Sequence, residues 1–548
     1  MTEKKMLEPL PKGQPFPMNY QSAKIDRNAL FALNQYFPIT AVAATRTRYH
    51  RAHLTFDYLK SDLLEYDCPK PPRHHTPAYY AAFESVRQDL GLFKEQSKIV
   101  PLTTGAVAKH PDLPHSKSPG LPHKIMGYAT KGEAISDPAV LDEIRKIWYQ
   151  IEANVPIELP DVACYARAQV CERDVNKVRA TWGYPLTVYM AEAAYFYPIL
   201  DKLKNHDNPI IAYGVEIGNG GMTFIDKMCK TYPTKPILLG DWRRFDKTVP
   251  AWLIRDAFRI LSECIDWSHV QDSSGKIWPV REHRSRRRWR KLVNYFIDTP
   301  VRLSNGERFI KHGGVPSGAC FTNIIDSIVN ALVMRYTIYE ITGDFPLADC
   351  YLGDDSVVVL PKKICLNAFA EFAEEQFGMI FNAEKSSQVM DRTLVHFLGY
   401  YNRGGHPYKP IDTIIASTIY PEHTVTDKLE TISRLIGQAY SCFDPVDATQ
   451  FVRCADLLLK EINLQPEDVE TYIHTYPSRF KFLSTLGLDP REITIPKLHG
   501  DVLTWKTLPH LNRRTWKHRN RDWNALYLSG IATYNKMYPN EEIFISET

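Results

Sequence analysis

Two short apolar runs of strand type flank an acidic turn in the second half of the chain. Residues 350–352, Cys-Tyr-Leu, and residues 357–360, Val-Val-Val-Leu, are rich in β-branched and aromatic side chains. Between them lie Gly353, Asp354 and Asp355, and Gly-Asp is turn chemistry. The pattern predicts a β-hairpin with two adjacent carboxylates at its tip. The two carboxylates repel each other unless a divalent cation binds them. The hairpin tip is therefore either a cation site or a solvated acidic turn.

A second apolar run ends in a carboxylate. Residues 235–240, Lys-Pro-Ile-Leu-Leu-Gly, predict a short buried strand, and Asp241 follows it directly. Asp246 comes five positions later, and Thr248 and Pro250 then mark the start of a helix. A carboxylate that ends a central strand is typical of a site residue. For Asp246, the role of a helix N-cap is the simpler interpretation.

The longest helical pattern, at about 319–341, follows a Gly-Gly-Val-Pro-Ser-Gly turn. Its apolar residues recur at i, i+3, i+4 and i+7, which predicts a buried stripe. Thr322, Asp326 and Asn330 lie four positions apart on another face, where they need solvent, a neighbouring loop or a nucleotide as a polar partner. Ser317 stands where an N-cap is expected, although a glycine-rich turn that opens a helix is also an anion site.

The remaining patterns are less specific. Four prolines in residues 1–20 disfavour regular structure and indicate an arm that lies over another surface. Gly404, Gly405 and Pro407 indicate a domain boundary. Helices are predicted over much of 25–100, and over 137–158, 365–377 and 425–464, and short strands over 379–381 and 397–400.

Composition narrows the class of protein. The chain has 548 residues, enough for several domains, and its 44% hydrophobic content can form a large core. The 10 cysteines show no Cys-x-x-Cys spacing, which favours reduced intracellular thiols over a zinc ribbon. No apolar run approaches the ~18 residues of a transmembrane helix. The N-terminus lacks the apolar core of a secretory signal. Neither a transmembrane helix nor a secretory signal is therefore expected.

The net charge is only +4, so a surface that binds nucleic acid would have to come from local clusters of positive charge. Arg167, Arg173, Lys177 and Arg179 recur along an extended or looped segment, which suits a run of phosphates. Residues 281–291 are the densest basic run, with seven Arg or Lys in eleven positions. This run favours contact with a polyanion, with a flexible surface insertion nearly as good an interpretation. The C-terminal part adds Arg513, Arg514, Lys517, Arg519 and Arg521 around Trp516 and Trp523, which suits nucleic acid or a plain basic surface.

Two further segments have a simple and a functional interpretation. A Pro- and Gly-rich loop at 110–123 contains Ser118 and Gly120, and glycine permits close approach of the backbone to another group. A plain connector is the simpler interpretation of this loop. His74 and His75 form a possible metal pair, but adjacent histidines do not share a helix face, so an ordinary loop is favoured.

Together these features supply the parts of two-metal phosphoryl transfer. Two cations clamp the attacking and leaving oxygens of an in-line displacement, and carboxylates such as Asp241, Asp354 and Asp355 hold the cations. A lysine can protonate the pyrophosphate leaving group, and Lys385 follows a short strand downstream. Arginines of the basic segment upstream can neutralise a triphosphate.

The order of these features resembles the viral RNA-dependent RNA polymerases, most closely those of partitiviruses and less closely those of picobirnaviruses. The resemblance covers roughly residues 115–405. The matching segments are Asp241-x4-Asp246 for motif A, Ser317-Gly318-x3-Thr322 for motif B, Gly353-Asp354-Asp355 for motif C, Lys385 for motif D, residues 397–399 for motif E, Lys177-x-Arg179 with residues 182–185 for motif F, and residues 118–122 for motif G.

The resemblance implies an α+β right-hand polymerase of fingers, palm and thumb with an antiparallel-sheet palm. The expected domains are an N-terminal arm and fingers at 1–231, palm at 232–270, a fingers insertion at 271–312, palm at 313–405, and thumb and C-terminal region at 406–548.

The resemblance also implies the role of each site residue. Asp241 and Asp354 would hold two Mg²⁺ or Mn²⁺ ions, with Asp355 assisting, and Lys385 would be the general acid. Asp246 would sense the ribose 2′-hydroxyl. Asp326 departs from the asparagine of many positive-strand RNA virus polymerases, which would alter this recognition or carry a proton. Nucleotide contacts are expected from Ser317, Gly318, Thr322, Asp326, Lys177 and Arg179, and RNA contacts from Ser118, Gly120, Arg167, Arg173, Arg286, Arg287 and Arg288.

The implied partners are an RNA template and product, ribonucleoside triphosphates and a viral capsid protein, without a membrane. Such an enzyme would replicate and transcribe a double-stranded RNA genome inside a capsid in the host cytoplasm. A reverse transcriptase shares the palm, but its hairpin usually reads Tyr-x-Asp-Asp, and Asp246 favours ribonucleotides. A non-catalytic RNA-binding or capsid-associated protein would not need Asp241, Asp354 and Asp355 together.

Overall fold

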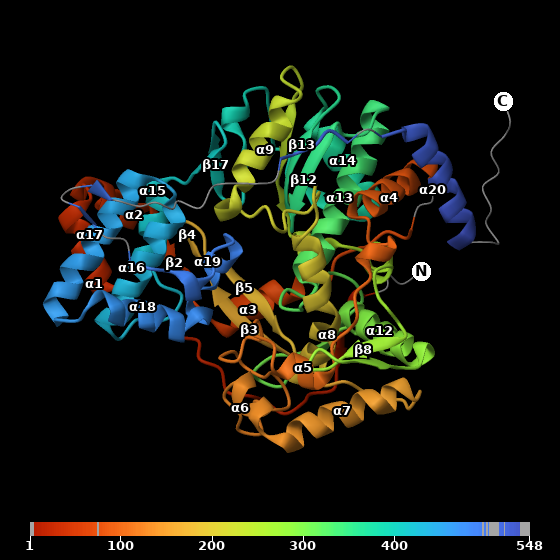
Figure 1. Ribbon diagram of the computed structural model, residues 1–548, viewed down its shortest axis with the longest axis horizontal. Helices are drawn as coiled ribbons and strands as arrows, with labels where there is room; N and C mark the ends of the chain where they lie inside the picture. The colour runs from red at the N-terminus through yellow and green to blue at the C-terminus, as the bar shows by residue number, and fades with distance from the viewer. Residues whose placement is uncertain are drawn as a thin grey trace.

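A four-stranded antiparallel sheet is the main landmark of the computed structural model drawn in Figure 1. The structure describes residues 5–73, 76–495, 498–499, 502–503, 515–519 and 521–537. The strand order is β12-β13-β6-β15. The strands are β6 (Ile237–Gly240), β12 (Ala348–Leu352), β13 (Asp355–Val359) and β15 (Ser387–Val389).

The inner strands of this sheet are buried on both faces, which explains their continuous apolar sequences. Leu238 and Val358 pack into the larger hydrophobic core with helices α11, α13 and α14. Leu239 and Val357 point the other way, as alternate strand residues do, and pack into a second core with α9. The helices are α9 (Gly221–Lys230), α11 (Ala251–Ser262), α13 (Thr322–Thr342) and α14 (Leu366–Phe377).

A buried network of charges fastens the outer strand β12. Arg335 of α13 has a side chain that is 0% exposed, and its Nε donates to Asp349 Oδ2 over 2.7 Å. Its Nη2 donates to Asp89 Oδ2 over 2.6 Å. Arg519 and Arg521, near the end of the chain, pair with the same two carboxylates. Asp89 belongs to α4 (Pro77–Leu90), and α20 (Trp523–Met537) packs along that helix (Figure 1).

A second sheet of mixed direction has the strand order β1-β11-β10-β3-β5. Its strand β1 comes from the N-terminal arm, so the prediction that this arm lacks regular structure is wrong for Leu7–Leu10, which pair with the edge of β11. The sheet comprises β1 (Leu7–Leu10), β3 (Val162–Ala168), β5 (Val178–Gly183), β10 (Pro300–Arg302) and β11 (Arg308–Lys311). Nearby elements are α3 (Phe56–Leu64), α5 (Thr104–Ala108), α6 (Lys131–Ser136), α7 (Pro138–Glu152), α8 (Leu186–Lys204), α12 (Glu282–Ile297), and the strand pairs β2 (Tyr49–Arg51) with β4 (Val170–Glu172) and β8 (His269–Gln271) with β9 (Ile277–Pro279).

A helical lobe, at the left of Figure 1, brings the two halves of the chain together. Asp26 caps helix α1, and its carboxylate accepts from Arg434 of α16 over 2.6 Å. A small sheet, β16-β17-β18, precedes the C-terminal helices of this lobe in the chain. The elements are α1 (Arg27–Tyr36), α2 (Ile39–Arg48), β16 (His396–Phe397), β17 (Tyr400–Arg403), β18 (His406–Tyr408), α15 (Ile411–Ile419), α16 (Lys428–Cys442), α17 (Pro445–Ile462), α18 (Pro466–Thr475) and α19 (Lys481–Thr485).

The structure corrects two expected helix caps. Helix α13 begins at Thr322, and its cap position is Phe321, so Ser317 is not its N-cap. Asp246 is not an N-cap either, because it lies inside the short helix α10, and Pro250 precedes α11. Both side chains are therefore available for other contacts. Helix α10 spans Phe245–Thr248.

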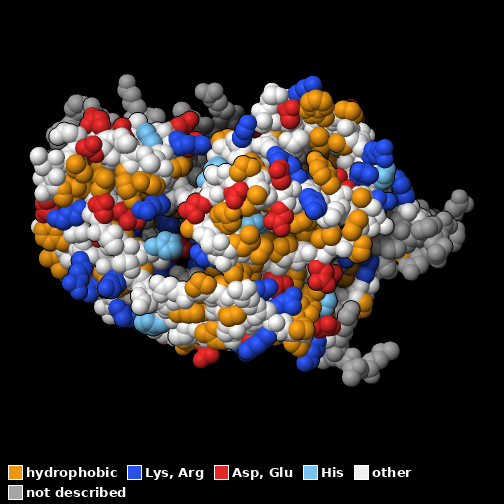
Figure 2. All heavy atoms as spheres, turned by 90° about the horizontal axis from the view of Figure 1, so that it is seen from below, with side chains coloured by type: hydrophobic (Ala, Val, Ile, Leu, Met, Phe, Trp, Pro, Cys, Tyr) orange, Lys and Arg blue, Asp and Glu red, His pale blue; other side chains and the backbone are white. Residues whose placement is uncertain are grey.

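Seen from below, the molecule is hollowed beside the helical lobe, and Lys, Arg and His side chains line the hollow (Figure 2). Within the described residues, no helix combines the length and the apolar character that a membrane crossing requires. His74, His75, Arg513 and Arg514 lie outside the described residues.

Candidate active site

One cleft brings together residues from three of the segments singled out in the sequence. It encloses about 740 Å³. Asp241 lies at the end of β6, Lys177 and Arg179 come from β5 and the turn before it, and Lys385 comes from the turn after β14. All four side chains are exposed to the cleft solvent. The remaining lining residues are Trp242, Arg243, Arg244, Ile380, Phe381, Asn382, Ala383 and Glu384.

The backbone of Asp241 is fixed by the turn that carries Lys385. The Asp241 N–H donates to Ser386 Oγ over 2.9 Å, and the Asn382 N–H donates to the Asp241 carbonyl over 2.8 Å. Directly after Asp241, strand β7 pairs with strand β14, so the residues before the Lys385 turn are also bonded to the chain that follows Asp241. Sequence reasoning missed Asn382 and Ser386, although both flank Lys385 in a polar turn. The two strands are β7 (Trp242–Arg243) and β14 (Ile380–Phe381).

Helix α13 holds the acidic hairpin in place. The Gly353 N–H donates to Ser327 Oγ over 2.8 Å, and Asn330 Nδ2 donates to the Gly353 carbonyl over 3.1 Å. Gly353 has φ +61°, in the left-handed region that favours glycine. Because Ser356 pairs with Gly240, the hairpin tip lies beside the end of β6, next to Asp241. The prediction of a β-hairpin at this position is confirmed.

The carboxylates at the tip accumulate negative charge. Desolvation, followed by the charge of Asp246, raises the pKa of Asp354, while Arg179 lowers it. Desolvation also raises the pKa of Asp355 to about 7, and Asp354 and Asp241 add to this shift. Oxygen donors with excess negative charge suit Mg²⁺ or Mn²⁺. The donor chemistry of Asp241 and Asp354 therefore fits a divalent cation.

Asp355 is oriented differently from its neighbour. Its Oδ2 accepts from the Leu398 N–H over 2.6 Å, and its Oδ1 accepts from the Ser356 N–H over 3.1 Å. Leu398 lies in the turn between β16 and β17, so Asp355 joins the hairpin to the small sheet. Across the described part of the chain, no three His, Cys, Asp or Glu side chains converge as a preassembled metal site.

The turn before α13 faces Asp246. Ser317 Oγ donates to the Asp246 carboxylate, and the Trp182 N–H donates to the Ser317 carbonyl over 2.9 Å. Thr322 Oγ1 donates to the Pro316 carbonyl over 2.8 Å and accepts from the Gly318 N–H over 3.4 Å. The polar residues of this turn thus position one another, and Asp246 is fixed by its contact with Ser317.

Gly318→Ala is expected to destabilise this turn. Gly318 has φ +143°, and a Cβ there would lie 2.1 Å from the Trp182 carbonyl oxygen, a backbone atom that cannot rotate away. We expect a loss of about 1–3 kcal/mol in the free energy of unfolding, measured by urea denaturation. Gly343→Ala is the matched control, since Gly343 has φ +79° but no atom within 4 Å of its Cβ position. Equal losses in both variants would contradict the role of the clash.

Asp326 is a buried residue of α13. The residue is 4% exposed, and no donor among the described residues hydrogen-bonds its Oδ1. Burial, followed by the charge of Asp246, raises the pKa of Asp326 well above its usual range. Asp326, which stands where many positive-strand RNA virus polymerases have asparagine, is thus a buried carboxyl group close to the charge of Asp246.

The basic segment divides into two groups. Lys177 and Arg179 line the cleft, whereas Arg167 pairs with Glu422 over 3.0 Å and Arg173 donates to the Arg46 carbonyl over 2.9 Å. The structure therefore does not bring Arg167 and Arg173 to the Asp241 cleft.

The Pro- and Gly-rich loop packs against the end of the basic segment. Ser118 Oγ and the Tyr165 hydroxyl share a hydrogen bond of 2.8 Å. Gly120 has φ +68°, and a Cβ there would lie 2.7 Å from the Tyr184 carbonyl oxygen. The close approach that this glycine permits is thus to the backbone of Tyr184.

The dense basic run is helical rather than a flexible insertion, because most of it lies in α12, which packs on α7. Arg286 pairs with Glu282 over 2.7 Å on the exposed side. Arg287 donates to the Glu152 carbonyl over 2.9 Å, and Arg288 pairs with the Glu152 carboxylate over 3.5 Å with its side chain 14% exposed. Two of the three arginines therefore also hold α7 in place.

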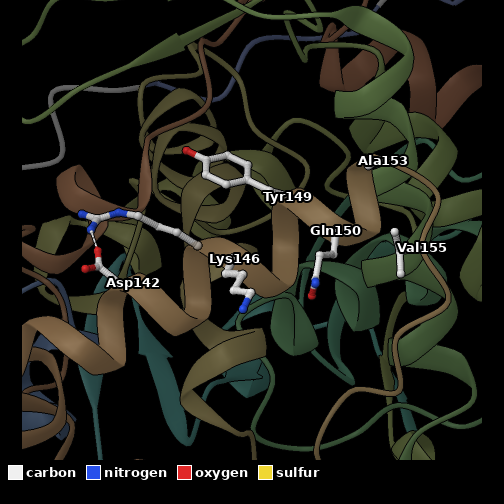
Figure 3. A pocket seen from close by; sticks show the side chains of 7 residues that line it. Asp142, Lys146, Tyr149, Gln150, Ala153 and Val155 are labelled. Carbon is white, nitrogen blue, oxygen red and sulfur yellow. Dashed lines mark hydrogen bonds and ion pairs between the residues drawn. The ribbon is translucent and has the colours of Figure 1, made fainter.

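A second hollow lies on the exposed side of α7 (Figure 3). It encloses about 500 Å³. An ion pair of 2.8 Å joins Asp142 to Arg145 at its rim, and the exposed Tyr149 lies beside them. None of the expected catalytic residues lines this hollow.

The central sheet, its acidic hairpin and the surrounding helices define a right-hand polymerase fold. The structure aligns with Sicinivirus 3Dpol RNA dependent RNA polymerase with a TM-score of 0.64 and 15% sequence identity. The alignment covers 88% of this chain and 99% of the other. The expected fold class is therefore confirmed.

Residues 26–435 match the family model of viral RNA-dependent RNA polymerase, and the chain belongs to this family. Similar proteins, each named RNA-directed RNA polymerase, come from Atkinsonella hypoxylon virus (27% identity over 58% of this chain), Cryptosporidium parvum virus 1 (27% over 69%) and white clover cryptic virus 1 (24% over 64%). The matches span 52%, 74% and 60% of these relatives. The resemblance to partitivirus-like polymerases is thus confirmed.

Proposed function

We propose that this protein is an RNA-dependent RNA polymerase, which adds ribonucleotides to an RNA 3′-hydroxyl on a template and releases pyrophosphate. The main support is the composition of one cleft, which is lined by Asp241, Lys385, Lys177 and Arg179. Asp354 lies at the end of the neighbouring strand pair. Charges of both signs around one cavity suit a triphosphate and the ions that accompany it.

Asp241 and Asp354 would hold two Mg²⁺ or Mn²⁺ ions, and Asp355 would assist while it fixes the hairpin to Leu398. When bound, such ions supply electrostatic stabilisation of the attacking and leaving oxygens. The raised pKa of Asp354 supports this assignment, since a nearby cation would relieve the repulsion that raises it.

The remaining residues would position the nucleotide. Lys177 and Arg179 would contact its phosphates, since both line the cleft. Asp246 would accept the ribose 2′-hydroxyl, which distinguishes ribonucleotides from deoxyribonucleotides. Ser317 supports this role because it already donates to Asp246. Gly318, Thr322 and Asp326 would complete the nucleotide site.

Lys385→Met is expected to lower kcat by about 10²-fold or more, because general acid catalysis contributes factors of this size. KM should change little, since Lys385 would act on the leaving group during the reaction. Single-nucleotide incorporation measured by rapid quench tests this. Lys363→Met, at an exposed position after β13, is the control, and an equal effect of both substitutions would argue against a role in proton transfer.

RNA contacts are proposed for Ser118, Gly120, Arg167, Arg173, Arg286, Arg287 and Arg288. The support differs among them, because Arg288 is largely buried while Arg286 is exposed. Replacing Arg286 by glutamine should weaken RNA binding and reduce its salt dependence. Unchanged affinity would remove this part of the proposal.

The domain limits follow the same proposal: palm at 232–270 and 313–405, fingers at 1–231 and 271–312, and thumb with the C-terminal region at 406–548. The central sheet draws all its strands from the two palm segments, which supports this division. A viral capsid protein would be the partner, and the enzyme would work inside the virion in the host cytoplasm.

The proposal is tested by incorporation on a single-stranded RNA template with Mg²⁺, comparing ribonucleoside with deoxyribonucleoside triphosphates. Template-dependent use of ribonucleotides alone is expected. Preference for deoxyribonucleotides would indicate a reverse transcriptase instead. RNA binding without incorporation of either, with capsid protein and primers supplied, would indicate a non-catalytic protein.

A further inference from the structure

Two ionisable side chains are buried where the Pro- and Gly-rich loop and the turn before α13 meet helix α8. Lys131 of α6 is 7% exposed and Glu192 of α8 is 1% exposed. Burial lowers the pKa of Lys131 and raises the pKa of Glu192, in both cases to about 8. Burial of such groups costs stability unless they are hydrogen-bonded. Both side chains bond to the backbone of a segment that the proposed function uses.

Lys131 holds the Pro- and Gly-rich loop. Its Nζ donates to the Ser118 carbonyl over 2.6 Å and lies 5.0 Å from the centre of the Tyr189 ring of α8, as in a cation–π contact. At the next residue of the loop, the Leu186 N–H of α8 donates to the Pro119 carbonyl over 2.8 Å. Two successive carbonyls of this loop are therefore fixed, one by Lys131 and one by α8.

Glu192 holds the turn before α13. The Cys320 N–H donates to Glu192 Oε2 over 2.9 Å. Because α13 begins at Thr322, this N–H precedes the helix and has no partner within it. The Trp182 N–H binds the Ser317 carbonyl at the other end of the same turn. The turn is thus fixed at both ends by the segment that contains Trp182 and Glu192.

We propose that Lys131 and Glu192 are positioning residues, of which Lys131 places the 118–122 loop for RNA and Glu192 places the 317–320 turn for the incoming nucleotide. The inference rests on the function proposed above, which assigns RNA contacts to the loop and nucleotide contacts to the turn. Tyr189 and Glu192 are three positions apart and therefore neighbours on α8. One helix thus supports both segments through two contacts that can be removed separately.

Amide hydrogen exchange tests the Glu192 contact without any measurement of activity. In Glu192→Met the Cys320 N–H loses its acceptor, so its exchange in the full chain should become about tenfold faster or more, as expected for one lost hydrogen bond. Glu192→Gln keeps an oxygen that can accept the same bond, and it should exchange as slowly as the wild type. Mass spectrometry of peptides that cover 317–321 measures the exchange.

The control for this experiment is Glu143→Met, at an exposed position on α7, which should exchange like the wild type. If Glu192→Met does not fold, Glu192→Asp replaces it, because the shorter side chain withdraws the acceptor and stays polar. Unchanged exchange in the variant without the acceptor would overturn the role of Glu192. Exchange in Glu192→Gln as fast as in that variant would overturn it as well.

Binding of single-stranded RNA over a salt series tests Lys131. Fluorescence anisotropy should show that Lys131→Met lowers the affinity by about threefold to tenfold, the effect of one lost hydrogen bond. The dependence of affinity on salt should not change, since a lysine buried to this extent makes no phosphate contact of its own. Lys146→Met, an exposed lysine on α7, is the control and should bind like the wild type. Wild-type affinity in Lys131→Met, or a weaker salt dependence, would overturn its positioning role.

The two variants should also affect different steps of nucleotide incorporation. Glu192→Met should raise KM for the ribonucleoside triphosphate about tenfold, by the loss of one hydrogen bond, and leave RNA affinity unchanged, whereas Lys131→Met should do the reverse. Equal changes in both quantities in both variants would indicate general loosening of the fold and overturn the proposal. Absence of all incorporation by the wild type would contradict the proposed polymerase function, while the exchange of the Cys320 N–H would still decide the role of Glu192.

Discussion

Asp354→Asn is expected to lower template-directed nucleotide incorporation by about 10²- to 10³-fold, the size of effect seen when one preorganised electrostatic group is removed. Asparagine keeps the shape of the side chain but removes the charge that would hold a cation. The fold should persist, because the hydrogen bonds that hold the turn do not involve the Asp354 side chain: the Gly353 N–H donates to Ser327 Oγ, and Asn330 Nδ2 donates to backbone carbonyls of the turn.

Two measurements make this expectation specific. Incorporation on an RNA template gives the loss of activity, and thermal unfolding reports the fold. Because its environment raises the pKa of Asp354, the ionised side chain costs stability near neutral pH. The variant should therefore be as stable as the wild type or more stable. Glu375→Gln, an exposed carboxylate on α14, is the control. Full activity of Asp354→Asn would show that this carboxylate is not required.

Arg335→Ala is expected to destabilise the protein by about 3–5 kcal/mol, since removing one partner of a buried ion pair leaves an uncompensated charge. Arg335 and Asp349 are both 0% exposed. Burial opposes the ionised form of Asp349, yet the charge of Arg335 holds the pKa of this carboxyl well below its usual range. Without Arg335, Asp349 would keep a hydrogen bond of 3.0 Å from the Tyr351 hydroxyl and, as its nearest remaining ion pair among the described residues, a longer contact of 3.5 Å with Arg519.

Urea denaturation measures this loss. The control is Lys428→Ala, which removes an ion pair of 2.8 Å to Glu461 in which both side chains are 38% exposed. Exposed pairs of this kind contribute about 0–1 kcal/mol. Similar losses in the free energy of unfolding for the two variants would show that burial does not increase the contribution of the Arg335 ion pairs to stability.

The parts of this fold that could be predicted are those that leave a local pattern. The short apolar runs on each side of Gly353, aromatic before it and β-branched after it, predict the hairpin, and i, i+3, i+4 spacing predicts α13. The position of Asp241 at a strand end follows in the same way. Its proximity to Asp354 does not, because it depends on the register that pairs Ser356 with Gly240.

The residues that were not predicted each make one hydrogen bond to a residue far away in the sequence. Ser386 accepts from the Asp241 backbone, and Leu398 donates to Asp355, but neither residue type signals such a contact. The basic segment illustrates the opposite error. Its four cations form one pattern in the sequence, whereas only Lys177 and Arg179 line the cleft. Arg167 lies opposite Arg179 in the sheet, but its side chain pairs with Glu422.

The attachment of Asp241 to the Asn382–Ser386 turn has a mechanical consequence. The turn binds the Asp241 residue through both its N–H and its carbonyl, so a displacement of Lys385 carries the end of β6 with it. Asp241 and Lys385 are therefore linked on one wall of the cleft. Arg179 belongs to the other sheet and Lys177 directly precedes its strand β5, so sliding between the two sheets would change the distance between these two cations and Asp241.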